Sequence, residues 1–260
     1  MYMKQQKTSW GKVADWYDEL LEKDSDSYQQ KVVLPNVLRL LDIKKGETVL
    51  DLACGQGFFA QEFHKKGAKT IGIDIAPELI EIARKKSPKE IQYHISSADN
   101  LSFLKDDSVD KATAILAIQN IENFSGVFKE CSRVLGKSGR LLIVLNHPAF
   151  RIPEKTSWGW DEAAKTQYRR VGEYMSESRH KIQMHPSTGS GRDPGEYTIS
   201  FHRPIQAYVK SLAKNGFAIT RLEEWISHKK SQSGPRAKAE DIARKEIPLF
   251  LCIEAVKIND

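Results

Sequence analysis

Between about residues 45 and 147, short apolar runs rich in β-branched residues alternate with amphipathic segments. The apolar runs have the length and composition of buried strands, and the segments between them have helical periodicity. The strands expected are Thr48–Ala53, Lys69–Asp74, Ile91–Ser96, Val109–Ile118 and Arg140–Asn146, and the helices are Phe58–Lys66, Pro77–Lys86, a short one near Leu101, and Phe124–Leu135. Such alternation builds a doubly wound, parallel sheet, so we predict an α/β fold with its ligand at the carboxyl ends of the strands.

The segments on either side of this alternating region complete the predicted sheet. Helices are predicted ahead of it at Trp10–Leu21 and about Tyr28–Leu41, and after it at Pro204–Asn215. The chain then ends in the strands Phe217–Ile226 and Leu249–Ile258, with a basic connection that carries a short helix at Ala237–Lys245. We expect these two strands to pair as an antiparallel closing hairpin on a mostly parallel, seven-stranded sheet.

A long segment from His147 to about Tyr197 interrupts the regular pattern and exceeds an ordinary connection. Its aromatic residues argue against disorder, so we expect a lid-like insertion that recognises a substrate. With 260 residues the chain is expected to form a single domain. Its parts are a helical cover (1–44), a cofactor-binding core (45–147), a substrate-binding insertion (148–200), and a closing helix with strands (201–260).

Composition and charge exclude several classes of protein. No apolar run approaches the roughly 20 residues that span a bilayer, and the N-terminus lacks the apolar core of a signal peptide. The three cysteines, Cys54, Cys131 and Cys252, are far apart, so neither disulfides nor a metal site is expected and a cytoplasmic location is the default. The net charge of +6 suits a nucleic-acid partner, but Lys and Arg are mixed with 34 acidic residues, which does not favour one. The oligomeric state is not indicated.

The turn after the first expected strand predicts a nucleotide-type ligand. Gly55 and Gly57 lack the side chains that would hold a ligand away from the backbone N–H groups there. The second strand ends in Asp74, at the distance where an acidic residue reaches ribose hydroxyls in nucleotide-binding units. The sequence therefore predicts a ligand that contains adenosine.

Three features favour S-adenosylmethionine over a nicotinamide dinucleotide, which this glycine pattern would also fit. Asp51 stands just before the turn, where it can offset the positive charge of a methionine moiety but would repel a pyrophosphate. The segment Ser97–Asn100 follows the third strand and offers a carboxylate to an adenine amino group. The third feature is the antiparallel closing hairpin.

On these residues the chain resembles the class I S-adenosylmethionine-dependent methyltransferases, in the broad subgroup that includes quinone-biosynthesis and other small-molecule enzymes. The matching motifs are VLDLACGQGFFA, IGIDIAP, SSADNLSF, DKATAILAIQNIENF and VLGKSGRLLIVLNHP. The resemblance implies that the methionine end is lined by Asp51, Ala53, Gly55 and Gly57, the ribose by Asp74 and Ile75, the adenine by Asp99 and Asn100, and the sulfonium by Ala117 and Gln119. It also implies that the N-terminal helix covers the cofactor with Tyr17.

Methyl transfer asks a protein to align acceptor, methyl group and sulfur and to exclude water. His147 is the predicted general base, because it follows the fifth strand at the ligand-binding edge; a structural turn at this position is the alternative. Gln119 and Asn120 are predicted to orient the acceptor. The other predicted contacts with the acceptor are Trp158, Tyr174 and His202, with Arg151, Arg169, Arg170 and Arg179 as partners for an acidic group.

The predicted function is methyl transfer from S-adenosylmethionine to an oxygen or nitrogen of a small organic acceptor by in-line displacement, with S-adenosylhomocysteine as product. A nucleic-acid methyltransferase is the first alternative, and a non-catalytic protein that binds the cofactor is the second. A nicotinamide oxidoreductase comes last. The sequence AIQN after the fourth strand replaces the NPPY-like element that indicates methylation of adenine N6 or of a glutamine amide.

Overall fold

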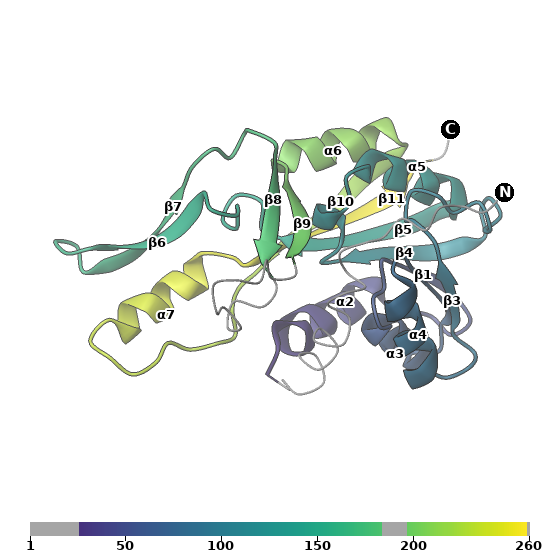
Figure 1. Cartoon of the computed structure of the whole chain (residues 1–260), viewed down its shortest axis with the longest axis horizontal. Helices are drawn as coiled ribbons and strands as arrows, with labels where there is room; N and C mark the ends of the chain where they lie inside the picture. Colours follow the sequence, from purple (N-terminus) through teal and green to yellow (C-terminus); the bar gives the residue numbers. More distant parts are fainter. Residues whose placement is uncertain (1–25, 184–196, 259–260) are drawn as a thin grey trace.

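One seven-stranded sheet with helices on both faces forms the body of the protein (Figure 1). The computed structural model describes residues 26–183 and 197–258, so the predicted helix Trp10–Leu21 with Tyr17 lies outside the described residues. The strands, in their spatial order, are β3 (Gln92–Ile95), β2 (Lys69–Asp74), β1 (Thr48–Leu52), β4 (Val109–Ile115), β5 (Leu135–Asn146), β11 (Phe250–Lys257) and β10 (Phe217–Trp225).

The sheet is parallel except for β11. Neighbouring strands from β3 to β5 pair in parallel, whereas β11 runs antiparallel to both β5 and β10. The mostly parallel sheet and its antiparallel closing pair are therefore confirmed. The parallel strands place their carboxyl ends at one edge, where the chain order reverses between β1 and β4, and this is the position where open α/β sheets bind ligands.

The helices bury both faces of the sheet. Figure 1 shows α2 (Leu34–Leu41), α3 (Phe58–Lys65) and α4 (Pro77–Lys86) on one face, with α5 (Phe124–Val134) and α6 (Ile205–Lys214) on the other. Side chains alternate between the faces: in β1, Val49 joins the cluster under α2 and α3, and Leu50 and Leu52 join the one under α5 and α6. Because helices cover both faces of the sheet, the sequences of its strands are nearly continuous runs of apolar residues.

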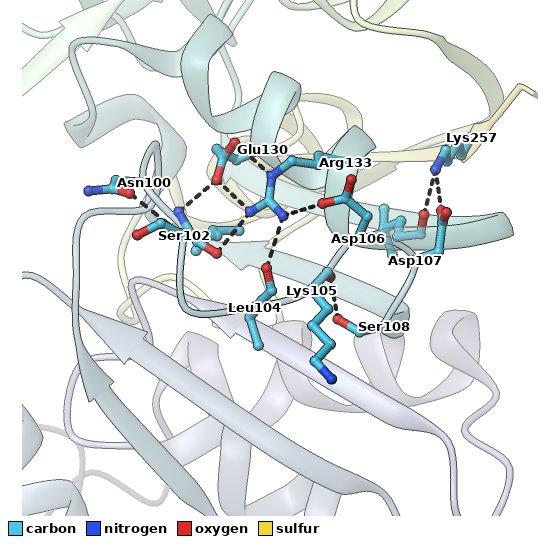
Figure 2. A network of polar contacts seen from close by, with 12 residues as sticks. Asn100, Ser102, Leu104, Lys105, Asp106, Asp107, Ser108, Glu130, Arg133 and Lys257 are labelled. Atoms are coloured by element: carbon cyan, nitrogen blue, oxygen red, sulfur yellow. Dashed lines mark hydrogen bonds and ion pairs between the residues drawn. The ribbon is translucent and has the colours of Figure 1, made fainter.

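The predicted helix near Leu101 is wrong, because residues 101–107 form turns. Figure 2 shows how side chains from α5 hold this segment instead. The Arg133 guanidinium donates to the carbonyl oxygens of Leu101 and Leu104 at 2.8 and 2.9 Å, and the Glu130 carboxylate accepts from the Leu101 N–H at 2.7 Å. These contacts satisfy backbone groups that a helix would otherwise pair, so no helix is needed.

The insertion after β5 consists of two antiparallel strand pairs. One is β6 (Thr156–Asp161) with β7 (Thr166–Val171), and the other is β8 (Ser178–Gln183) with β9 (Tyr197–His202). The β6–β7 hairpin extends away from the main sheet, and α7 (Ala237–Glu246) packs against β7 (Figure 1). Two short helical segments complete the described chain: η2 (Gln29–Val33), a π-helical turn, and η3 (Ile118–Asn120), a 3₁₀ turn.

Two findings concern the described residues alone. None of their helices combines the length and apolar character needed to cross a bilayer. In the same residues, no three His, Cys, Asp or Glu side chains are placed to share a metal ion.

Candidate cofactor and acceptor sites

A cavity of about 130 Å³ opens at the carboxyl ends of β1, β2 and β4. It lies at the reversal of strand order, where the predicted cofactor-binding residues were expected to meet. The predicted residues that line it are Asp51, Ala53, Gly55, Asp74, Ile75, Ala117 and Asn120. The cavity wall is completed by Cys54, Gln56, Phe58, Phe59, Leu79, Ile115, Leu116 and Ile121.

Asp51 is a buried carboxylate whose hydrogen bonding is incomplete. It stands directly opposite Thr113 in the β1–β4 register, and its Oδ1 accepts a 2.8 Å hydrogen bond from Thr113 Oγ1. Oδ2 is also buried and forms no hydrogen bond of ordinary geometry with a described residue, although the backbone N–H of Ala60 lies close enough to favour the charged carboxylate. Burial raises the pKa of Asp51 to about 7, an effect that the Thr113 hydrogen bond opposes. A bound cation would supply the missing partner and favour the charged form.

Asp74 ties the glycine turn to the end of β2. Its Oδ2 accepts from the Gly55 N–H at 3.0 Å and its Oδ1 from the Ala76 N–H at 2.9 Å. Burial raises the pKa of this carboxylate, while these backbone hydrogen bonds favour its charged form. Each carboxylate oxygen can accept more than one hydrogen bond, so Asp74 can hold the turn and still accept from ribose hydroxyls.

The two glycines of the turn are needed for different reasons. Gly55 has φ of +58°, and a Cβ there would meet nothing within 4 Å, so a side chain would project into the open cavity. Gly57 has φ of +83°, but a Cβ there would lie 2.3 Å from Tyr93 Oη. Gly57 does not line the cavity. The expectation that both glycines make room for the ligand therefore applies to Gly55, whereas Gly57 makes room for Tyr93.

Two of the non-glycine residues with a left-handed backbone lie where β1 and β4 meet the cavity. Ala53 directly follows β1 and has a φ of +51°, and Leu116 directly follows β4 and has a φ of +55°. Both residues line the cavity. Non-glycine residues adopt this left-handed conformation at a cost of about 1 kcal/mol or more, and they do so mainly where surrounding structure enforces it. Both positions lie on the cavity wall at the carboxyl edge of the sheet.

Asp99 and Asn100 stand apart from this cavity. The Asp99 carboxylate accepts from Ser97 Oγ and, at 2.7 Å, from the Asn123 side-chain amide, which also caps α5 by accepting from the Gly126 N–H. Asn100 is exposed. Neither residue lines the cavity, so their predicted contact with adenine remains a prediction.

A second, larger cavity of about 610 Å³ adjoins the first. The two share Leu116 and Asn120, which belong to the segment after β4. The larger cavity is otherwise walled by the end of β5, by the insertion with its β8–β9 pair, and by residues from α6, the start of β11 and η2. The two cavities therefore lie on either side of Leu116 and Asn120.

Gln119 and Asn120 line this larger cavity, as predicted for residues that orient an acceptor. The Gln119 side-chain amide donates to the Leu116 carbonyl at 2.7 Å, which leaves its buried Oε1 without a partner among the described residues. Gln119 does not line the cofactor cavity. Its predicted contact with the sulfonium therefore stays a prediction, and its Oε1 is a buried hydrogen-bond acceptor of a residue that lines the larger cavity.

The predicted general base, His147, does not line either cavity. The Ala149 N–H donates to Nδ1 at 3.2 Å, so Nδ1 holds the lone pair, and Nε2 donates to Glu224 at 2.7 Å. Burial lowers the pKa of His147, which keeps the ring neutral. A general base needs a free lone pair at the reacting group, and this ring offers none. The arrangement matches the structural turn that we gave as the alternative.

His202 lines the larger cavity with a ring nitrogen available. Its Nε2 lies 2.8 Å from the Tyr174 carbonyl oxygen, which can only accept, so Nε2 carries the proton and Nδ1 the lone pair of the neutral ring. No described residue donates a hydrogen bond to Nδ1. Burial lowers the pKa of His202, although the Tyr174 hydrogen bond opposes this shift, so the neutral form is favoured at neutral pH.

The remaining predicted contacts with the acceptor divide into two groups. Tyr174 does not line the cavity, but it orients His202 and accepts a 3.0 Å hydrogen bond from the Ile205 N–H through its hydroxyl. Trp158 is 39% exposed on β6, where the Arg169 guanidinium stacks on its ring. The structure therefore brings Gln119, Asn120 and His202 to the cavity and leaves Trp158 and Tyr174 outside it.

The cofactor class can be tested on the geometry of the smaller cavity. Asp51 Oδ2 is a buried acceptor that forms no hydrogen bond of ordinary geometry with a described residue, which suits the ammonium group of a methionine moiety. The open space at Gly55 and the carboxylate of Asp74 suit the ribose side of the same ligand. A pyrophosphate, by contrast, would place negative charge beside both carboxylates. The residues present fit S-adenosylmethionine.

Comparison with known proteins agrees with this assignment. Residues 50–143 match the family model described as a methyltransferase domain. The ubiquinone biosynthesis O-methyltransferase of Xanthomonas oryzae pv. oryzae is 29% identical over 129 residues, 46% of this chain and 54% of that protein. The demethylmenaquinone methyltransferase of Chlorobaculum parvum is 32% identical over 131 residues, 50% of this chain and 54% of that protein. A solved S-adenosylmethionine-dependent methyltransferase of Mesorhizobium loti, at 23% identity, has a TM-score of 0.67 and covers 89% of this chain and 98% of that chain.

Residues 50–143 therefore form a methyltransferase domain, and the chain has the fold of a solved S-adenosylmethionine-dependent methyltransferase. The residues of the smaller cavity fit S-adenosylmethionine as its cofactor. The matched residues include the β1 turn, β2 and the segment after β4, which together form the smaller cavity. The chain spans about half the length of the curated relatives it matches.

Sequence reasoning missed much of the cavity wall. Phe59 and Leu79 look like ordinary core residues of α3 and α4, and only the packed fold turns them toward the cofactor cavity. Leu116 had a detectable signal, since it follows β4 directly at the ligand-binding edge. Arg203 was also missed as a residue of the larger cavity, because nothing in the local sequence distinguishes it from an exposed arginine.

Proposed function

We propose that this protein transfers a methyl group from S-adenosylmethionine to an oxygen or nitrogen atom of a small organic acceptor. The observation that carries the proposal is the junction of the two cavities at Leu116 and Asn120. The larger cavity, at about 610 Å³, has the size of sites that enclose small molecules. A cavity of this volume favours a compact acceptor over a nucleic-acid strand.

Each part of the site has a role in this reaction. S-adenosylmethionine, when bound, supplies a methyl group that its positive sulfur has already activated. We assign the cofactor's ammonium to Asp51 and its ribose to Asp74, with Gly55 giving the space between them. The chain must then align the acceptor with that methyl group and exclude water, because correct placement supplies most of the acceleration.

We assign the proton transfer to His202 rather than to His147. A hydroxyl or ammonium acceptor must lose a proton before or while it attacks, and the free Nδ1 lone pair of neutral His202 can take that proton. Tyr174 holds the ring by accepting from Nε2, which fixes the tautomer that a base needs. Gln119 Oε1 can accept a second hydrogen bond from the acceptor.

Release of S-adenosylhomocysteine tests the proposal. The purified chain would be incubated with S-adenosylmethionine and, separately, with a pool of small phenols and hydroxy compounds, a pool of small amines, total RNA, or no acceptor. We expect release only with the small-molecule pools, and its loss in Asp74→Ala. Release with RNA alone would replace the proposal by nucleic-acid methylation, and tight cofactor binding without release in any arm would favour a non-catalytic role.

A further inference from the structure

The larger cavity contains a buried positive charge that no residue described in the structure neutralises. Arg203 follows β9 and is 4% exposed, yet no carboxylate among the described residues forms an ion pair with it. Its Nη2 donates to the carbonyl oxygens of Ile121 and Glu122 at 3.0 and 2.8 Å. Its Nη1 is buried without a hydrogen-bond partner in this part of the chain, and Arg203 lines the cavity.

A purely structural role explains only part of this arrangement. The two carbonyl contacts account for Nη2, and the rings of Phe124 and Phe201, 4.4 and 4.9 Å from the guanidinium carbon, stabilise the positive charge by cation–π attraction. The hydroxyl of Tyr208 lies close enough to the Arg203 guanidinium to interact with it, but forms no hydrogen bond of ordinary geometry with Nη1. Burial raises the pKa of Tyr208, so its hydroxyl stays neutral and adds no negative charge. A guanidinium is permanently charged, and burial without an anion is costly, so an unpaired donor of this kind points to a ligand.

The rest of the cavity has the same charge. Arg151 and Arg169 also line it, and the only acidic residue among the lining residues described is Glu154. Arg169 donates to the Phe150 carbonyl and to Thr156 Oγ1 rather than to a carboxylate. The wall of this cavity therefore carries more positive than negative charge, which attracts an anionic molecule.

We propose that the methyl acceptor is a small organic anion whose carboxylate binds Arg203 Nη1. This proposal rests on the proposed function, because it names the class of molecule that occupies the acceptor cavity. A carboxylate is preferred over a phosphate because a single buried guanidinium nitrogen is free, and one negative charge matches it. The aromatic rings of Phe201 and Tyr208, which also line the cavity, suit an apolar or aromatic body attached to that carboxylate.

Because Arg203 is next to His202, a carboxylate of the acceptor that binds Arg203 would also orient the acceptor. Both residues line the cavity, at the end of β9 and directly after it. An acceptor that is anchored through its carboxylate at Arg203 is held at a fixed distance from the His202 ring. The anchor therefore selects the acceptor and orients its reactive atom, in the way that charged groups fix a ligand in a mostly apolar pocket.

Calorimetric titration of the protein loaded with S-adenosylhomocysteine tests the anion site directly. The probes are benzoate and 1-naphthoate, their neutral amides, and inorganic phosphate. We expect at least one carboxylate to bind tenfold or more tightly than its amide. Equal affinity of each acid and its amide, or no binding of either carboxylate up to 50 mM (on the order of the weakest affinity a charged anchor would give), would overturn the proposal. So would tighter binding of phosphate than of both carboxylates.

Variants then assign the preference to Arg203. Arg203→Met should reduce the preference for carboxylate over amide to less than threefold, with unchanged affinity for S-adenosylhomocysteine. Arg221→Met, which removes an arginine from β10 outside the cavity, is the matched control and should leave the preference intact. An equal loss in both variants would overturn the proposal. If Arg203→Met does not fold, the acid–amide comparison in the unmodified protein and in Arg203→Lys still decides.

The same experiment separates this inference from the function on which it rests. Failure of S-adenosylhomocysteine to bind would refute the proposed function itself. Binding of S-adenosylhomocysteine without any preference for carboxylates would refute the anionic acceptor alone.

Discussion

The buried carboxylate of Asp51 is expected to lower the free energy of unfolding at neutral pH, although it provides a partner for the cofactor. The variant Asp51→Asn tests this effect on stability. The carboxyl is 1% exposed, and burial raises its pKa from 3.8 to about 7. The folded state therefore holds a proton that the unfolded state has lost between these two pH values. Because the folded state binds more protons there, the free energy of unfolding falls as pH rises from about 4 to about 7, and the deficit stays constant above pH 7.

The size of this effect follows from the two pKa values. At about 1.4 kcal/mol per pH unit, the difference corresponds to an upper limit of about 4 kcal/mol at pH 8. An asparagine cannot ionise, and its amide can keep a hydrogen bond with Thr113, whose hydroxyl donates and accepts. We expect Asp51→Asn to be about 2–4 kcal/mol more stable than the unmodified protein at pH 8, and within about 1 kcal/mol of it at pH 4.

Urea denaturation without cofactor, followed by circular dichroism at pH 4, 5.5, 7 and 8, measures the difference. Asp42→Asn is the matched control, because Lys44 lowers the pKa of this exposed carboxylate and the expected sign is opposite. A stability difference for Asp51→Asn that does not grow between pH 4 and pH 7 would refute the reasoning. A variant less stable than the unmodified protein at pH 8 would refute it as well.

Three further predictions follow from the same site. The Kd for S-adenosylmethionine, measured by calorimetry, should rise about tenfold for each pH unit below pH 7, because the protonated form of Asp51 must ionise before it can pair with the cofactor. Asp51→Asn should bind more weakly, with a Kd that does not depend on pH. With saturating cofactor and an identified acceptor, turnover should fall at acidic pH as His202 gains its proton, at a pH below 6.5 because burial lowers its pKa. His202→Asn should lower kcat and remove that pH dependence, whereas His147→Asn should keep the same pH profile; an unchanged kcat in His202→Asn would exclude His202 as the base. Gly57→Ala should destabilise the fold by about 2–4 kcal/mol, since its Cβ would meet Tyr93 Oη in a left-handed backbone conformation, and by less in a Tyr93→Phe background; equal losses in thermal denaturation would contradict this contact.

Periodicity and turn chemistry predicted the fold because they are local properties of the sequence. The alternation of apolar runs and amphipathic segments located β1 to β4 to within three residues at each end, whereas β5 begins at Leu135, five residues before its predicted start. The absence of a parallel crossover between the last strands indicated the antiparallel β10–β11 pair. The prediction of a helix near Leu101 failed because backbone carbonyl groups of this segment accept hydrogen bonds from Arg133, about 30 residues away in sequence. Such a contact leaves no local signal.

The sequence predicted the position of a site residue where that residue stands at the end of a strand. It did not predict the role of a residue where that role depends on the hydrogen bonds of its ring. Asp51 and Asp74 reach the cofactor cavity because the carboxyl ends of parallel strands share one edge of the sheet. His147 stands at the same edge, but Glu224 from β10 and the Ala149 N–H engage its two nitrogens. The role that we propose for His202 depends on Tyr174 in the insertion, and the unpaired Nη1 of Arg203 depends on the packed cavity as a whole.

The most direct test of the central claim is calorimetric titration with S-adenosylmethionine, S-adenosylhomocysteine and NADH, on the unmodified protein, Gly55→Val and Gly46→Val. Both glycines have a left-handed backbone, and a Cβ at either position would meet no atom within 4 Å, but only Gly55 lines the cofactor cavity. We predict micromolar binding of the first two ligands, none of NADH, and loss of binding in Gly55→Val alone. Binding of NADH without S-adenosylmethionine, or equal affinity for S-adenosylmethionine in both variants, would contradict the account.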